Sequence, residues 1–486
     1  MARGVGSGED LVVPDTPASP TIFVLFGATG DLAARMVLPA FYTLAQKNLL
    51  PKEWRLIGNG RGDVAHEDFR AKVHEALGND VEEAEWEAFS KNLLFAGGGF
   101  DETGPGSLLD VIRDVEDELD DEVQPNFIHY LAIPPVAFES TAKALKKHGL
   151  TDHARVVFEK PYGTSPDDFR QLDATVHEVL DEEQVFRIDH FLGKEATQNL
   201  HVLRFANQTF STAWHGDHVA AVQIDVPETL DVANRAGFYD ATGAMMDMVV
   251  THLMQVAAEV AMEPPLSLDA QDLQEARESV IAAFRPLSPD DVVLGQFEGY
   301  RDLEGVADDS QTDTFCAVRL WVDTGRWHGV PFLLRSGKRL GVSEQRVSLV
   351  MKPVEGPLPK PDRPSVITLS LAGSGSVAAD FVLKQPGEGI KLAHVRQTLE
   401  LETVPDADPL PPYVALLYDV LTGDRSLFTS SVGLEHAWRV ADPVLKNKPA
   451  LESYEPGSMG PAAAGELAAP YGWLVSGDGA DGKSES

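Results

Sequence analysis

The sequence predicts an α/β domain built on a parallel sheet, followed by a larger α+β domain. Three observations lead to this prediction. Near the N-terminus a continuous apolar run, Thr21 to Phe26, precedes a glycine-rich turn and a helical pattern. Strand-like and helix-like segments then alternate up to about residue 190, which is typical of βαβ units. Farther along, helical patterns are mixed with β-rich segments at 219–226, 314–322 and 346–351.

Length and composition agree with two folded domains. The 486 residues exceed one ordinary core, and 43% hydrophobic with 24% charged residues is typical of globular proteins. We expect the domains at 21–190 and 191–475. The segment 1–20 has no long apolar stretch and 476–486 is small, polar and Gly-rich, so we expect both to be disordered tails.

The chain is strongly acidic, with 76 Asp and Glu residues against 40 Lys and Arg and a formal net charge of −36. This charge repels phosphodiester backbones and anionic headgroups, so we expect no nucleic-acid partner and no membrane partner. No apolar run reaches the roughly 18 residues of a membrane helix. The single cysteine, Cys316, cannot form an intrachain disulfide. We therefore expect a cytoplasmic protein.

The glycine-rich turn, Gly27-Ala-Thr-Gly-Asp-Leu-Ala33, joins the first predicted strand to the first predicted helix. Glycines let the backbone turn tightly and approach a pyrophosphate, which the helix N-terminus stabilises. A plain turn is the alternative for so short a motif. The strand–turn–helix context favours a Rossmann-like site in which the cofactor is bound by Gly27, Thr29, Gly30, Asp31 and Leu32.

A second predicted strand, 54–58, leads to Asn59-Gly60-Arg61-Gly62, where such a fold holds the adenosine ribose. The Arg61 guanidinium can form a bidentate contact with the 2′-phosphate of NADP. The alternative is a solvated loop arginine. Because of Arg61 we expect NADP as the cofactor, and Asp63, two residues on, leaves NAD as a weaker substitute.

Two further predicted strands, 127–133 and 155–159, end in proline-bearing turns. In an open parallel sheet the ligand lies at the carboxyl ends of the strands. We therefore expect 134–135 and 159–163, which includes Lys160, to line the cofactor crevice.

Two segments carry candidate catalytic residues. In Arg187-Ile-Asp-His-Phe-Leu-Gly-Lys-Glu195, His190 and Lys194 lie four apart, so on one helical turn they share a face and can hold a phosphate. In the apolar helix predicted over Gly237 to Gln255, Asp247 and His252 lie about 140° apart and can border one pocket. An exposed turn with incidental ion pairs and a satisfied core histidine are the respective alternatives.

These segments together resemble the glucose-6-phosphate dehydrogenase family, whose hallmarks are GxxGDLA, EKPxG, RIDHxLGKE and a GYYDxxGAxxDMxxNH helix. Segments 326–338 and 454–461 also resemble the family's RWxGVPFxLRxGK and YxxGSxGP motifs. The resemblance covers roughly residues 21 to 475.

The resemblance implies oxidation of glucose 6-phosphate to 6-phosphoglucono-1,5-lactone with NADP, the first step of the pentose phosphate pathway. It implies that His252 is the general base and that Asp189 orients it. His190, Lys194 and Tyr413 then bind phosphate. The sugar hydroxyls are contacted by Lys160, Glu228, Asp247 and Lys338, and Lys160 also touches the cofactor. The family further implies a mostly antiparallel sheet, assembly as a homodimer or homotetramer, and no metal.

The chain departs from the family pattern at four positions, Phe191, Thr251, Ser343 and Val414. These departures predict weaker substrate binding or an altered sugar preference. A short-chain reductase or sugar epimerase is excluded, because no tyrosine has a lysine four residues later. A non-catalytic cofactor-sensing paralogue and a dehydrogenase of another phosphosugar are the remaining alternatives.

Overall fold

The computed structural model describes residues 19–78, 81–119, 124–232 and 235–476, so the expected tails fall almost wholly outside the described residues. The chain divides into two units. The first unit comprises Met1–Tyr162, Leu172–Ile188 and Tyr413–Leu427, and the second comprises Gly163–Gln171, Asp189–Pro412 and Phe428–Ser486. A segment from far beyond residue 191 thus belongs to the first unit.

The first unit contains a six-stranded parallel sheet with the strand order β3-β2-β1-β4-β5-β6. Its strands are β1 (Thr21–Phe26), β2 (Trp54–Asn59), β3 (Leu93–Ala96), β4 (Asn126–Leu131), β5 (Ala154–Phe158) and β6 (Val185–Arg187). The four strands predicted from the sequence are β1, β2, β4 and β5, so the α/β prediction is confirmed. The short strands β3 and β6 give too few residues for a periodic signal.

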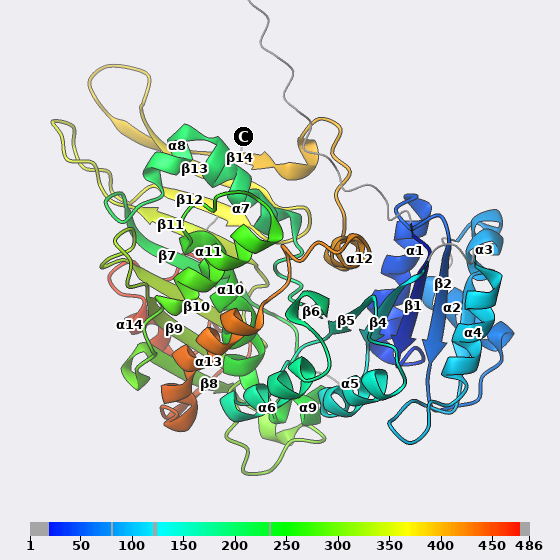
Figure 1. The fold of residues 1–486 in the computed structure, drawn as a ribbon. Helices are drawn as coiled ribbons and strands as arrows, with labels where there is room; N and C mark the ends of the chain where they lie inside the picture. The colour runs from blue at the N-terminus through cyan, green and yellow to red at the C-terminus, as the bar shows by residue number, and fades with distance from the viewer. Residues whose placement is uncertain (1–18, 79–80, 120–123, 233–234, 477–486) are drawn as a thin grey trace, which may run out of the picture. The chain divides into compact units, whose positions relative to one another are not determined.

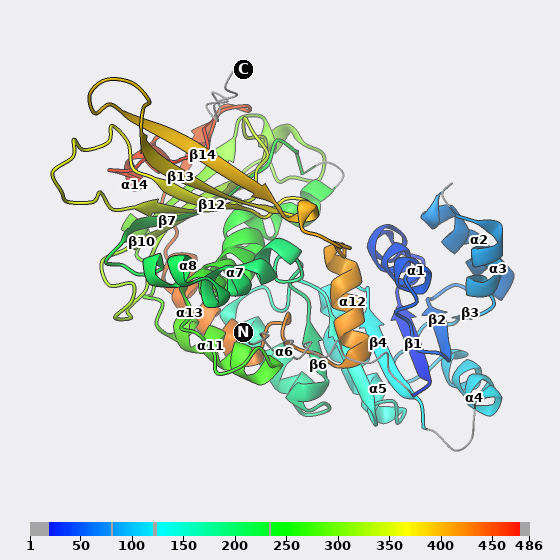
Figure 2. The ribbon, with the colours of Figure 1, turned by 90° about the horizontal axis from the view of Figure 1, so that it is seen from above.

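Helices cover both faces of this sheet. On one face lie α1 (Leu38–Gln46), α2 (His66–Leu77) and α3 (Glu83–Ser90), and on the other lie α4 (Leu108–Glu118) and α5 (Phe138–Lys147) (Figures 1 and 2). This arrangement follows from right-handed crossovers, because the chain moves outward from β1 to β3 in one direction and from β4 to β6 in the other.

The helix α12 (Pro412–Thr422) joins the first unit through the strand β5. The guanidinium of Arg155 on β5 donates to the carbonyls of Val420 and Leu421, each at 2.7 Å. These carbonyls belong to the last turn of the helix, whose C-terminal carbonyls need partners from outside the helix. Arg155 therefore holds the C-terminal end of α12 against the sheet.

The second unit contains a nine-stranded sheet with the order β14-β13-β12-β11-β7-β10-β9-β8-β15. Its strands are β7 (Val219–Pro227), β8 (Val292–Phe297), β9 (Phe315–Trp321), β10 (Pro331–Gly337), β11 (Arg346–Met351), β12 (Val366–Ser370), β13 (Ser376–Lys384), β14 (Leu392–Glu400) and β15 (Leu451–Tyr454). Only the pairs β7–β10 and β8–β15 are parallel. The predicted α+β domain with a mostly antiparallel sheet is confirmed.

Most helices of the second unit cover one face of this sheet. They are α7 (Glu195–Ala206), α10 (Met254–Ala261), α11 (Ala270–Ala282) and α13 (Ser431–Lys446), whereas α14 (Ala462–Leu467) lies on the opposite face (Figures 1 and 2). The helix Met245–Leu253, which precedes α10, contacts β9 and β10. Across the described ranges, no helix combines the length and apolar character needed to cross a membrane.

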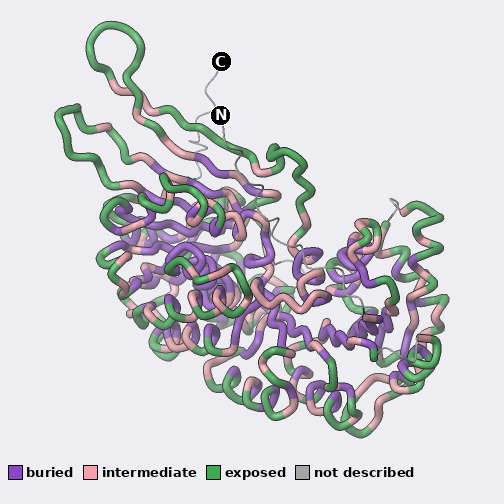
Figure 3. Tube along the Cα trace, turned by 45° about the horizontal axis from the view of Figure 1, so that its top comes forward, coloured by how far each residue is buried: buried purple, intermediate pink, exposed green. Residues whose placement is uncertain are grey.

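The strands β13 and β14 leave one end of the nine-stranded sheet open to solvent (Figure 3). Phe381 and Leu383 of β13 and Val395 and Leu399 of β14 are between 44% and 63% exposed. The antiparallel register pairs Phe381 with Val395, and side chains two residues apart along a strand share a face. The four side chains therefore form one exposed apolar face, which we call the β13–β14 face.

Candidate active site

The predicted cofactor turn has a backbone that requires glycine. Gly27 follows β1 with a φ of +76°, and a Cβ at this position would lie 2.2 Å from the carbonyl oxygen of Ala132. The amide of Gly30 donates to the carbonyl of Gly27 at 2.9 Å, which closes the turn before the helix begins at Asp31. The strand–turn–helix order predicted from the sequence is thus present.

The side chain of Arg61 is exposed and makes no hydrogen bond or ion pair with another described residue. Its loop is instead held through the backbone, because the amide of Gly99 donates to the carbonyl of Gly60 at 2.9 Å. The loop that supplies this bond, Gly97-Gly98-Gly99, follows β3 and was missed in the sequence. A Cβ at Gly97 would lie 2.7 Å from the carbonyl oxygen of Gly62, so the two loops pack backbone to backbone.

Lys160 and Tyr413, predicted to bind substrate, lie beside the same carboxylate in the first unit. The hydroxyls of Tyr130 and Tyr413 donate to Oε1 of Glu159 at 2.5 Å and 3.3 Å. Burial raises the pKa of Glu159, and the two tyrosine hydrogen bonds and the adjacent Lys160 oppose that shift. Glu159 was expected only as part of the segment 159–163 that lines the cofactor crevice; its position directly after β5 was the available signal for a role of its own.

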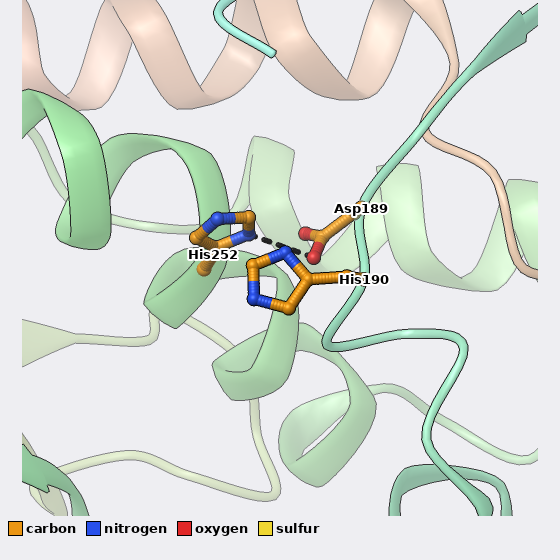
Figure 4. A group of neighbouring side chains, drawn as sticks. All are labelled: Asp189, His190 and His252. Carbon is orange, nitrogen blue, oxygen red and sulfur yellow. Dashed lines mark hydrogen bonds and ion pairs between the residues drawn. The ribbon is translucent and has the colours of Figure 1, made fainter. Parts of the chain in front are cut away.

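The pair predicted to carry out proton transfer is formed in the second unit. Nδ1 of His252 lies 2.7 Å from Oδ1 of Asp189, and both side chains are almost completely buried (Figure 4). The same carboxylate oxygen accepts a hydrogen bond from the backbone amide of Phe191 at 2.8 Å. The Phe191 amide therefore holds the carboxylate of Asp189 in place, and this carboxylate orients the imidazole ring of His252.

The helix that carries Asp247 and His252 is a π-helix, Met245–Leu253, and not the α-helix that we expected. Hydrogen bonds in a π-helix link residues five apart, whereas those in an α-helix link residues four apart. Asp247 and His252 are therefore separated by about one turn, and the expected separation of about 140° was wrong. The hydroxyl of Thr251 donates to the carbonyl of Asp247 at 2.5 Å within this turn. Single π-turns occur frequently at functional sites.

His190 and Lys194 lie in consecutive turns before α7, so the prediction that they share a helical turn was wrong. The ammonium of Lys194 donates to the side-chain oxygen of Gln345 and, at 3.0 Å, to the carbonyl of Leu371. Burial lowers the pKa of Lys194 to about 8, while the charge of Asp189 acts in the opposite direction. The exposed-turn alternative is excluded, because Lys194 is only 8% exposed.

Phe191, one of the four departures, fills the space between these basic side chains. Its ring centroid lies 4.5 Å from the ammonium of Lys194 and 5.0 Å from the imidazole centroid of His252. The ring of His190 lies 4.6 Å from that of His252. The ring packs against the basic side chains and carries no negative charge that could compete with an anionic substrate for them.

Glu228 and Lys338 meet at the ends of the parallel strands β7 and β10. Nζ of Lys338 donates to Oε2 of Glu228 at 2.5 Å, and the amide of Glu228 donates to the carbonyl of Gly337 at 2.9 Å. Ser343, another departure, accepts a hydrogen bond from the amide of Thr229 at 2.9 Å. Ser343 thus holds the loop that follows Glu228. The remaining departure, Val414, is buried in α12.

Asp189, His190 and His252 each offer a ligand atom, and these atoms lie within 4.8 Å of one another. Two imidazoles and a carboxylate form a donor set that divalent transition metals accept. In this structure, however, Oδ1 of Asp189 already accepts hydrogen bonds from His252 and Phe191. The geometry therefore describes an oriented base, and metal binding would compete with that arrangement.

Comparison with known proteins identifies the family. The model for the glucose-6-phosphate dehydrogenase NAD binding domain matches residues 24–199, and the model for the C-terminal domain matches residues 201–474. The chain belongs to the glucose-6-phosphate dehydrogenase family. This membership excludes the short-chain reductase and sugar epimerase alternatives.

Relatives in the glucose-6-phosphate dehydrogenase family are similar over nearly the whole chain. Glucose-6-phosphate 1-dehydrogenase 2 of Mycobacterium tuberculosis is 36% identical over 481 residues, which is 93% of each chain. A solved glucose-6-phosphate 1-dehydrogenase of Mycobacterium avium is 34% identical with a TM-score of 0.82, covering 94% of this chain and 99% of that one. A glucose-6-phosphate dehydrogenase solved with glucose 6-phosphate gives a TM-score of 0.88 at 28% identity, with the same coverage.

Proposed function

We propose that this chain oxidises glucose 6-phosphate at C1 to 6-phosphoglucono-1,5-lactone and transfers the hydride to NADP. Family membership and the likeness to a dehydrogenase solved with this substrate support the proposal. The single observation that carries it is the buried pair of His252 and Asp189, whose facing atoms lie 2.7 Å apart. A cofactor-sensing paralogue has no need for such a pair.

His252 accepts the proton of the C1 hydroxyl on Nε2, because Nδ1 faces the carboxylate. As the C1–O bond becomes a carbonyl, the C1 hydride leaves with its electron pair. The nicotinamide supplies the hydride acceptor, so the products are the lactone, NADPH and one proton. Asp189 holds the ring in the required tautomer and stabilises the imidazolium that forms.

We assign the substrate phosphate to His190, Lys194 and Tyr413, and the sugar hydroxyls to Lys160, Glu228, Asp247 and Lys338. Lys194 supports this assignment, since its described hydrogen-bond acceptors are the neutral oxygens of Gln345 and Leu371. A buried ammonium with neutral acceptors attracts an anion more strongly than one held in an ion pair. Such a local positive site operates in spite of the net charge of the chain.

We assign the cofactor to the turn Gly27–Leu32, to Arg61 and to Lys160, with NADP preferred over NAD. The guanidinium of Arg61 supports this preference, because no described side chain competes for it. The carboxylate of Asp63 in the same loop can accept a hydrogen bond from the 2′-hydroxyl of NAD but repels a 2′-phosphate, which leaves NAD as a weaker substitute.

The test is the rate of nicotinamide reduction by purified protein with glucose 6-phosphate, with NADP and NAD in parallel. We expect rapid reduction with NADP, slower reduction with NAD, and almost none with the His252→Asn variant. If another phosphosugar is oxidised with a higher kcat/KM, that sugar and not glucose 6-phosphate is the substrate. If no phosphosugar reduces the nicotinamide, the sensing paralogue is favoured.

We propose further that two copies of the chain associate through the β13–β14 face as a homodimer. Four large apolar side chains exposed together on one sheet face form a contiguous apolar surface of the kind that marks protein–protein contacts. Light scattering of the wild type and of a Phe381→Asp, Leu399→Asp variant tests this: the wild type should be dimeric and the variant monomeric. A tetrameric wild type would require a second interface.

A further inference from the structure

Tyr239 carries a buried hydroxyl without a hydrogen-bond partner among the described residues. It lies on the short helix α9 (Ala236–Asp240), and its side chain is only 6% exposed. Its ring packs in a core cluster with Phe315, Leu340 and Tyr454. Most buried tyrosine hydroxyls are hydrogen-bonded, so an exception requires a physical reason.

The other two tyrosines of the same cluster follow the ordinary rule. The hydroxyl of Tyr300 donates to Asp240 at 3.1 Å. The hydroxyl of Tyr454 donates to the carbonyl of Lys338 at 2.7 Å. The surrounding core is therefore capable of satisfying tyrosine hydroxyls, and Tyr239 is distinguished from its neighbours by its position and not by its chemistry.

That position adjoins the groups assigned to the sugar. The ammonium of Lys338 lies 5.7 Å from the ring centroid of Tyr239. Burial raises the pKa of Tyr239 well above its ordinary value, and the nearby carboxylates of Asp247, Asp313 and Glu228 act in the same direction. The phenol therefore keeps its proton and is available as a donor beside these three carboxylates, which can only accept.

We propose that Tyr239 is a further substrate-binding residue, whose hydroxyl donates to a ring hydroxyl oxygen of the sugar phosphate. That ring hydroxyl donates its own proton to the carboxylate of Asp247 or Glu228. The inference rests on the proposed function and deepens it, because it names a neutral donor among charged groups. A hydroxyl of the substrate both accepts and donates, so it satisfies a phenol donor and a carboxylate acceptor together.

The proposal predicts opposite effects of one substitution on the free and the substrate-bound protein. Tyr239→Phe removes a hydroxyl that has no hydrogen-bond partner among the described residues, so the melting temperature should stay the same or rise. The bound state loses a hydrogen bond, so KM for glucose 6-phosphate should rise about 3- to 10-fold, with a much smaller change in kcat. Tyr300→Phe is the matched control, because it removes a satisfied hydroxyl from the same cluster: its melting temperature should fall and its KM should not change.

The partner hydroxyl is identified with 2-deoxy-, 3-deoxy- and 4-deoxyglucose 6-phosphate as substrates for both the wild type and Tyr239→Phe. The penalty of the substitution should disappear for the one analogue that lacks the partner of Tyr239. An unchanged KM, a fall in melting temperature that accompanies the rise in KM, or an equal penalty with all three analogues would overturn the inference.

Two control measurements distinguish a failure of this inference from a failure of the proposed activity or of the proposed sugar site. If the wild type does not oxidise glucose 6-phosphate, the proposed function and the role of Tyr239 fall together. If the wild type is active but Asp247→Asn leaves KM unchanged, the sugar site is misplaced and Tyr239 loses its role. If Asp247→Asn raises KM and Tyr239→Phe does not, the inference about Tyr239 alone is wrong.

Discussion

The imidazole of His252 faces the carboxylate of Asp189 across 2.7 Å, with both side chains buried. Asp189→Asn keeps the shape of the pair but replaces an acceptor by an amide, which permits the wrong imidazole tautomer. We expect kcat to fall about 10²- to 10⁴-fold, with NADP affinity nearly unchanged. Steady-state kinetics and fluorescence titration with NADP measure the two effects. A kcat within a few fold of the wild type would contradict the orienting role.

Lys194 should make substrate binding dependent on pH. Its pKa is lowered to about 8, so the ammonium is charged below that pH and loses its charge as the pH rises through it. An anionic phosphate binds the charged form, so KM for glucose 6-phosphate should rise as the pH increases above about 8, while kcat changes less. The Lys194→Arg variant keeps its charge throughout this range and should lack the rise. If both proteins show the same profile, another group is responsible.

Arg61 should distinguish the two nicotinamide cofactors. Arg61→Ala removes the partner proposed for the 2′-phosphate, which is present in NADP and absent from NAD. We expect Kd for NADP to rise about 10- to 100-fold and Kd for NAD to change by less than about 3-fold. Calorimetric titration with each cofactor provides the comparison. Equal losses would place Arg61 elsewhere in the site.

Transition metals should inhibit, and chelators should not. The proposed chemistry needs no metal, so prolonged treatment with EDTA is expected to leave kcat unchanged. Added Zn²⁺ should inhibit by drawing together Asp189, His190 and His252, whose ligand atoms lie within 4.8 Å of one another. His190→Gln should require more zinc than the wild type for half-inhibition, with the rate of each protein normalised to its own rate without zinc. Loss of activity with EDTA, restored by a metal, would refute the metal-free mechanism.

Salt should stabilise the folded protein. A net charge of −36 destabilises the compact state through self-repulsion, which ions screen. We expect the melting temperature to rise by several degrees between roughly 0.05 M and 1 M KCl, and sucrose provides the uncharged control. A melting temperature that is constant or falls with KCl would show that attractive ion pairs outweigh this repulsion.

The sequence was most informative where a local pattern determines local structure. The apolar run of β1 and the turn at Gly27 appear where the pattern placed them, because continuous β-branched and aromatic residues favour a buried strand. The π-helix was not predictable, since apolar spacing over nine residues does not distinguish hydrogen bonds across four residues from those across five.

Contacts between residues that are far apart in the sequence could not be predicted from local sequence patterns. Tyr413 follows Glu159 by more than 250 residues, and only the fold brings its hydroxyl to that carboxylate. That the hydroxyl of Tyr239 has no partner among the described residues is likewise visible only in the structure. The sequence motifs identified the charged residues of the site, whereas a neutral residue among them, Tyr239, was recognised only from the structure.

The helix α12 also determines when the first unit can be completed during synthesis. Arg155 is bound to the carbonyls of Val420 and Leu421, and Arg425 donates to Glu182 at 2.8 Å. A ribosome must therefore translate nearly the entire chain before the first sheet receives its last helix. A fragment that ends near residue 200 would contain all six strands and yet leave Arg155 and Glu182 without these partners, so it should be less stable and more prone to aggregation than its length suggests.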